Sequence, residues 1–101
     1  MLQLIPQKLQ SVLWSRDIKK LDLKKDNLYI IHQILSFGRM EDLNWLLQAY
    51  TKAEIVKIFI EHPYKDYDRV RFNFIKNFFL DLKKQNLEEK QYVKNTPRYI
   101  G

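Results

Sequence analysis

The chain contains no cysteine and has only two glycines and three prolines. The lack of cysteine excludes disulfide bonds, a thiol nucleophile and cysteine-ligated zinc, and it is typical of the reducing cytoplasm. With so little glycine, the chain has no glycine-rich loop that would cradle a phosphate group. No apolar run approaches the ~20 residues that cross a bilayer. We therefore expect a cytoplasmic protein that does not enter a membrane.

The side chains that usually carry catalysis or bind metals are also sparse. The two histidines, His32 and His62, fall on different predicted helices and lack the spacing of a metal site. There is no nucleophile elbow and no ordering typical of a Ser/His/Asp triad. We expect no catalytic residue, no bound metal, no cofactor and no enzymatic activity.

Apolar and basic side chains are abundant by contrast. Of the 101 residues, 46% are hydrophobic, which is enough for one domain with a single core. The net charge of +6 is uneven: residues 41–62 carry two basic and four acidic groups, a net of −2. Residues 1–40 (seven basic, three acidic) and 63–101 (nine basic, five acidic) each carry +4. This surplus favours an acidic protein partner or nucleic acid, and a plain lysine-rich solvated surface fits it equally.

The clearest local pattern is a pair of helices that meet at Thr51. Apolar residues from Leu43 to Tyr50 recur at helical spacing and define the first helix. Thr51 and Glu54 then match a capping box, in which each side chain accepts a hydrogen bond from the backbone N–H of the other residue. The second helix should end near His62, because the proline that follows cannot continue it.

The rest of the chain also predicts helices. A short helix follows Pro6, and a longer one runs from residue 23 or 24 to Phe37 with Asp22 as its N-cap. Gly38 should end that helix in a left-handed conformation. We predict an all-α fold, a compact bundle of about four to five short helices over residues 1–84, followed by a polar, partly ordered C-terminal tail over 85–101.

The helix that begins after Asp68, which is its predicted N-cap, and extends to about residue 84 is the most apolar of the set. Its stripe is centred on Phe74, Ile75, Phe78 and Leu82, which predicts the central core helix. Arg71 falls within the same stripe. It either lies beyond the edge of the core or pairs with a carboxylate.

Trp45 lies opposite the apolar stripe of its helix, and Trp14 stands where the first short helix ends. Either a second layer of the domain covers Trp45, or Trp45 contacts a partner, because tryptophan is enriched at interaction hot spots. The segment Tyr64, Tyr67, Arg69 and Arg71 interleaves aromatic and basic side chains, as nucleic-acid-binding surfaces do. The side chains predicted to bind phosphate groups or an acidic partner are Lys83, Lys84, Lys90, Lys94 and Arg98.

A helix-turn-helix that reads DNA needs a turn of about three or four residues, often with glycine, and a recognition helix with exposed polar groups. The joint at Thr51 has no such turn, and the helix after it exposes mainly Lys52, Lys57 and Glu61. Nucleic acid binding therefore stays an alternative to protein binding.

Apolar, tryptophan and a few polar residues recur along the chain in an order and spacing that match a known family pattern. They are Leu13-Trp14, Leu21-Asp22, Ile30-Ile31, Ile34-Leu35, Gly38, Asp42, Trp45-Leu46, Tyr50, Glu54-Ile55 and Phe72-Asn73-Phe74. Over roughly residues 9–80 this pattern resembles a small all-helical prokaryotic domain of unknown function. Members of that family tend to carry arginine where Gln33 stands, and glycine where Thr51 follows Tyr50.

Such domains are often encoded beside a nucleotidyltransferase-like toxin of the abortive-infection type, which implies an antitoxin role. We therefore expect a non-enzymatic interaction protein that neutralises a toxin of this kind. The alternative is a basic, helix-turn-helix-like transcriptional regulator that binds nucleic acid. The residues expected to contact the partner are Trp14, Trp45, Tyr64, Tyr67, Arg69 and Arg71.

Overall fold

The structure, a computed structural model, describes residues 5–65 and 67–93. Within them it has four α-helices: α1 (Asn27–Phe37), α2 (Met40–Ala49), α3 (Lys52–Glu61) and α4 (Arg69–Phe74). A π-helical segment, η3 (Ile75–Phe79), continues α4, and three 3₁₀ segments are η1 (Gln7–Ser11), η2 (Ile18–Lys20) and η4 (Glu89–Gln91). The predicted all-α class is confirmed. The one β contact among the described residues is an isolated parallel bridge between Tyr67 and Val93.

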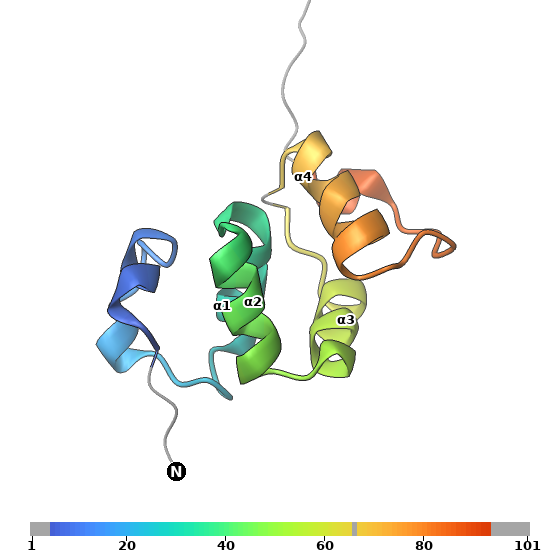
Figure 1. Ribbon diagram of the computed structural model, residues 1–101. Helices are drawn as coiled ribbons and strands as arrows, with labels where there is room; N and C mark the ends of the chain where they lie inside the picture. Colours follow the sequence, from blue (N-terminus) through green and yellow to red (C-terminus); the bar gives the residue numbers. More distant parts are fainter. Residues whose placement is uncertain (1–4, 66, 94–101) are drawn as a thin grey trace, which may run out of the picture.

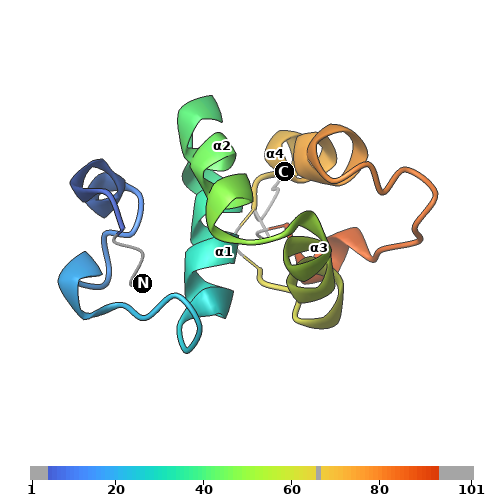
Figure 2. The ribbon, with the colours of Figure 1, turned by 60° about the horizontal axis from the view of Figure 1, so that its bottom comes forward.

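The helices are arranged around a central pair. Figure 1 shows α1 and α2 side by side, with the N-terminal segment on one side of the pair and α3 and α4 on the other. The same order is visible after rotation (Figure 2). Both flanking parts therefore pack on the α1–α2 pair.

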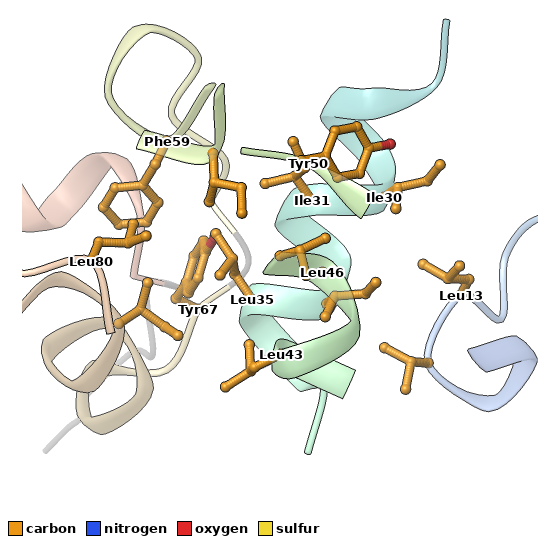
Figure 3. Packing of buried hydrophobic residues seen from close by; sticks show 14 of the residues in the cluster. Leu13, Ile30, Ile31, Leu35, Leu43, Leu46, Tyr50, Phe59, Tyr67 and Leu80 are labelled. Atoms are coloured by element: carbon orange, nitrogen blue, oxygen red, sulfur yellow. The ribbon is translucent and has the colours of Figure 1, made fainter. Parts of the chain in front are cut away.

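The central core helix is α1, in which every residue from Ile30 to Ser36 is buried. Leu13 approaches this helix from one side, whereas Phe59 and Leu80 lie on the other (Figure 3). Because α1 is enclosed by both flanking parts, its polar side chains are buried as well. The prediction that residues 69–84 form the central helix is therefore wrong.

A change of helix type explains this error. The α-helical pattern ends at Phe74, and the backbone N–H of Leu80 bonds the carbonyl of Ile75, an i+5 bond typical of a π turn. The wider turn alters the angular step per residue, so a wheel drawn for an α-helix misplaces the residues after it. Phe78 is 70% exposed, although Ile75 is buried as predicted. The helical segment ends at Phe79, before the predicted limit of residue 84.

The predicted capping residues at two helix starts are confirmed. The Glu54 backbone N–H donates to Thr51 Oγ1 at 3.1 Å, and the Thr51 N–H donates to Glu54 Oε1 at 2.9 Å. The helix that they begin, α3, ends at Glu61, one residue before His62. At the start of α4, the Asp68 side chain accepts a hydrogen bond from the backbone N–H of Arg71.

Two predictions about α1 are corrected. Asp22 accepts backbone hydrogen bonds from Lys24 and Lys25, so it caps a turn that precedes α1, and the helix starts only at Asn27. Gly38 has φ −72°, which is not left-handed. A Cβ atom at Gly38 would lie 2.7 Å from the carbonyl oxygen of Ile34. Glycine is thus required by the close approach of the backbone to α1, and not by a left-handed turn.

Arg71 follows neither of the two predicted alternatives. It reaches from α4 to the C-terminal end of α1, where its guanidinium donates to the carbonyl oxygens of Leu35 (2.6 Å), Ile34 (3.4 Å) and Gly38. The last carbonyls of a helix have no partner within the helix, and they form the negative end of its dipole. Arg71 therefore satisfies and neutralises this end of α1.

Tyr92 joins residues beyond α4 to the core. Its side chain is buried, its hydroxyl donates to the carbonyl of Phe59 at 2.6 Å, and its own carbonyl accepts from the Tyr67 N–H. Tyr92 thus packs with the helices although it lies within the tail predicted for residues 85–101. Residues 94–101 of that tail lie outside the described residues.

We predict that Arg71→Ala lowers the free energy of unfolding by about 2–3 kcal/mol, because charged hydrogen bonds to buried carbonyls are lost. Arg71→Lys keeps the charge but not the planar fork, so it should recover only part of the loss. Urea denaturation monitored by circular dichroism measures both effects. Equal stability of Arg71→Ala and the wild type would contradict this role.

Burial raises the pKa of Tyr92 to about 12. An unfolded tyrosine ionises near pH ~10. Because the folded pKa is the higher one, the resulting stabilisation is complete below the unfolded pKa and is lost as pH rises from about 10 towards 12. We expect the ring-carbon NMR signal of Tyr92 to titrate in that upper range. A midpoint near that of a free tyrosine, in folded protein, would contradict the burial.

Candidate protein-interaction surface

Large apolar side chains are exposed at the corner where α1 leads into α2. Trp14 is 57% exposed, Phe37 is 37% exposed and Met40 is 60% exposed. The rings of Trp14 and Phe37 meet edge to face, with centroids 4.9 Å apart. Phe37 ends α1 and Met40 begins α2. We call these three residues the corner surface.

The loop that carries Trp14 is fixed from both sides. The side-chain amide of Gln10 donates to the carbonyls of Leu13 (3.0 Å) and Arg16 (2.7 Å). Leu13 is completely buried, and the Ser15 hydroxyl bonds the hydroxyl of Tyr29 at 2.8 Å. Trp14 is therefore exposed on an ordered loop, which lowers the entropic cost of binding a partner.

Charged side chains of both signs lie near the corner surface. Lys8 pairs with Glu41 at 3.2 Å, and this ion pair joins η1 to the start of α2. Arg39, between Phe37 and Met40, is exposed and forms no ion pair with any residue in 5–65 or 67–93. An apolar centre with an unpaired cation beside it suits a partner surface that is apolar and acidic.

Arg16 is held at the base of the Trp14 loop by Asp26, at 3.1 Å, and lies over the ring of Tyr29. A backbone hydrogen bond from Asp22 lowers the pKa of Asp26, and the bond from Arg16 lowers it further. The carboxylate is thus kept ionised. Its ion pair with Arg16 neutralises part of the Arg16 charge within the domain.

Trp45 is only half-buried, and it packs against the core cluster. Of the two alternatives for this residue, the structure shows that other parts of the domain cover much of its side chain. Its remaining exposed part is available to a partner, but its truncation would also affect packing.

The other predicted contact residues do not form one surface with Trp14. Tyr64 is half-buried and stacks on the ring of His32, with centroids 5.0 Å apart. Tyr67 is completely buried, with its hydroxyl 2.8 Å from Nδ1 of His32. Arg69 is exposed and pairs with Glu89 at 2.7 Å. Arg71 is committed to the end of α1, so the aromatic and basic segment mainly builds the fold.

The predicted lysines lie on the surface beyond α4. Lys83, Lys84 and Lys90 are exposed, and the Lys83 ammonium lies 5.5 Å from the centre of the Phe78 ring. Lys94 and Arg98 lie outside the described residues. Among the described residues there is no cluster of three or more potential metal ligands of the His, Cys, Asp or Glu type. None of the helices in this part of the chain combines the length and hydrophobicity that a membrane span requires.

These features define a small all-helical domain with an exposed aromatic corner. The chain belongs to a family of unknown function, DUF6922, which matches residues 9–59. The match runs from η1 through most of α3 and includes the whole corner surface, and it ends before α4. Neither the curated proteins nor the solved structures include a match to this chain.

Sequence reasoning did not single out Phe37 and Met40. Phe37 belongs to a helix with apolar residues on more than one face, so its position gave no reason to expect exposure. The available signal was Gly38, which ends α1 between Phe37 and Met40.

The two tryptophans should differ in their effect on stability. Trp14→Ala should cost about 1 kcal/mol or less, since it removes an exposed ring with one edge-to-face contact. Trp45→Ala should cost about 2 kcal/mol or more, because it leaves a gap against the core. Guanidinium denaturation of both variants measures the difference. The opposite ranking would contradict the placement of the two rings.

Proposed function

We propose that this protein is a non-enzymatic interaction domain, most specifically an antitoxin-like partner that neutralises a nucleotidyltransferase-type toxin. The observation that carries the proposal is the corner surface, where Trp14, Phe37 and Met40 are exposed on ordered backbone. Tryptophan and other large apolar residues in such positions are typical centres of protein interfaces.

The charge of the chain supports an acidic partner. The net charge is +6, and Arg39, between Phe37 and Met40 in the sequence, has no ion-pair partner among the described residues. The active site of a nucleotidyltransferase is lined by carboxylates, so a basic, aromatic surface would be complementary to it. The toxin itself is proposed from the family resemblance, and the corner surface supports the interaction.

The geometry of the α2–α3 joint favours protein binding over base reading. Only Tyr50 and Thr51 separate α2 from α3, and α3 exposes a mixture that includes Lys52, Lys57 and Glu61. A recognition helix needs a longer turn before it and a polar, largely basic face.

We expect the full chain to form a stable complex with the product of the adjacent gene when the two are co-expressed and purified through a tag on one of them. Trp14→Ala should weaken this complex at least about tenfold in a titration, as truncation at an interface hot spot does. Trp14 is the better choice than Trp45, because its replacement leaves the core intact.

Leu47→Ala is the matched control, because Leu47 is a 41% exposed apolar residue of α2 outside the corner surface. The absence of any complex, or a complex that Trp14→Ala leaves unchanged, would refute the proposal. Binding of DNA or RNA that weakens steeply with salt would instead support the regulator.

A further inference from the structure

A second apolar surface lies on α4 and η3, outside the family-matched residues. Val70 is 79% exposed, Phe78 is 70% exposed, and Phe74 between them is half-buried. The rings of Phe74 and Phe78 are stacked with centroids 6.4 Å apart, so the side chains follow one another along the helix. We call these three residues the α4 stripe.

The packing of the segment holds the α4 stripe on the surface. Phe72 and Ile75 are buried on the core side, and Arg71 is bonded to the end of α1. The helix therefore cannot rotate to bury the stripe without losing these contacts. In Figures 1 and 2, α4 and the N-terminal segment lie on opposite sides of the α1–α2 pair.

Basic side chains outnumber acidic ones around the stripe, although Asp68 and Asp81 border it and Glu89 pairs with Arg69. Residues 69–80 contain Arg69, Arg71 and Lys76 and no acidic residue. Beyond them, the Lys83 ammonium lies over the Phe78 ring, and Lys84 is exposed. A second copy of the chain that paired stripe against stripe would bring the same cations to it. Residues 94–101, which carry Lys94 and Arg98 and no acid, would do so too. The complementary occupant is therefore acidic.

We propose that the α4 stripe docks an acidic amphipathic helix of a partner protein. Side chains spaced four residues apart over Val70 to Phe78 form a row about 12 Å long, which matches two turns of a facing helix. The apolar residues of that helix cover Val70 and Phe78, and its carboxylates pair with Lys83 and Lys84. The surface is separate from the corner surface and does not depend on the toxin as partner.

The test uses the full chain and two synthetic helical peptides of equal length. One is built from leucine, alanine and glutamate, and in the other lysine replaces every glutamate. Amide NMR spectra recorded during a titration should show shifts confined to residues around the α4 stripe for the acidic peptide only. Added salt should weaken the binding, since the flanking pairs are exposed.

Phe78→Ala should weaken binding of the acidic peptide by about tenfold, whereas Leu47→Ala should bind it as the wild type does. Both side chains are exposed, so both variants should fold. Trp14→Ala should also bind the peptide unchanged, which separates this result from the test of the corner surface.

Four outcomes would overturn the proposal. The acidic peptide causes no shifts at millimolar concentration, or the basic peptide binds equally well. Alternatively, the chain self-associates through Phe78 in the absence of peptide, which makes a second copy the occupant. Finally, vesicles of anionic phospholipid bind in a Phe78-dependent manner while the peptide does not, which makes the stripe a lipid-binding surface.

Discussion

Burial of α1 on all sides is the constraint on which the rest of the structure depends. An enclosed helix cannot send its polar groups to water, so its neighbours provide partners for most of them, with the buried Ser36 hydroxyl as an exception among the described residues. Gln33 donates to the carbonyl of Val12 in the N-terminal segment, and His32 lies 2.7 Å from the carbonyl of His62 through Nε2. Since a carbonyl only accepts, Nε2 carries the proton. Arg71 then donates hydrogen bonds to the carbonyls at the C-terminal end of α1. Each flanking part of the domain therefore forms hydrogen bonds with α1.

This division of roles explains which residues remain for binding. Tyr67 and Arg71 satisfy groups of α1, although their aromatic and basic character suggested a partner. Trp14 does not satisfy a polar group of α1, and the loop that carries it is held by a hydrogen bond from Gln10. The neutral amide of Gln33 reaches the Val12 carbonyl without placing a charge in the core.

Local chemistry made part of this structure predictable. The Thr51 cap, the Asp68 cap and the end of α3 before Pro63 follow from neighbouring residues alone, and the structure has all of them. The π turn after Phe74 has no signal among those read from the sequence, and Phe78, which was predicted to be in the core, is exposed within it. The role of Arg71 depends on contacts with residues more than thirty positions away.

The site was less predictable than the fold because it, too, depends on contacts between residues that are far apart in the sequence. Exposure is decided by what covers a side chain, and aromatic residues look alike in sequence whether they are buried or not. Trp14 and Tyr67 were equal candidates, yet one is on the surface and the other is in the core. The segment recognised by family similarity ends at Phe59, whose carbonyl accepts from Tyr92. The family match therefore covers less than the folded unit: in this chain, the donor to Phe59 and the cation at the end of α1 both come from residues that follow the match.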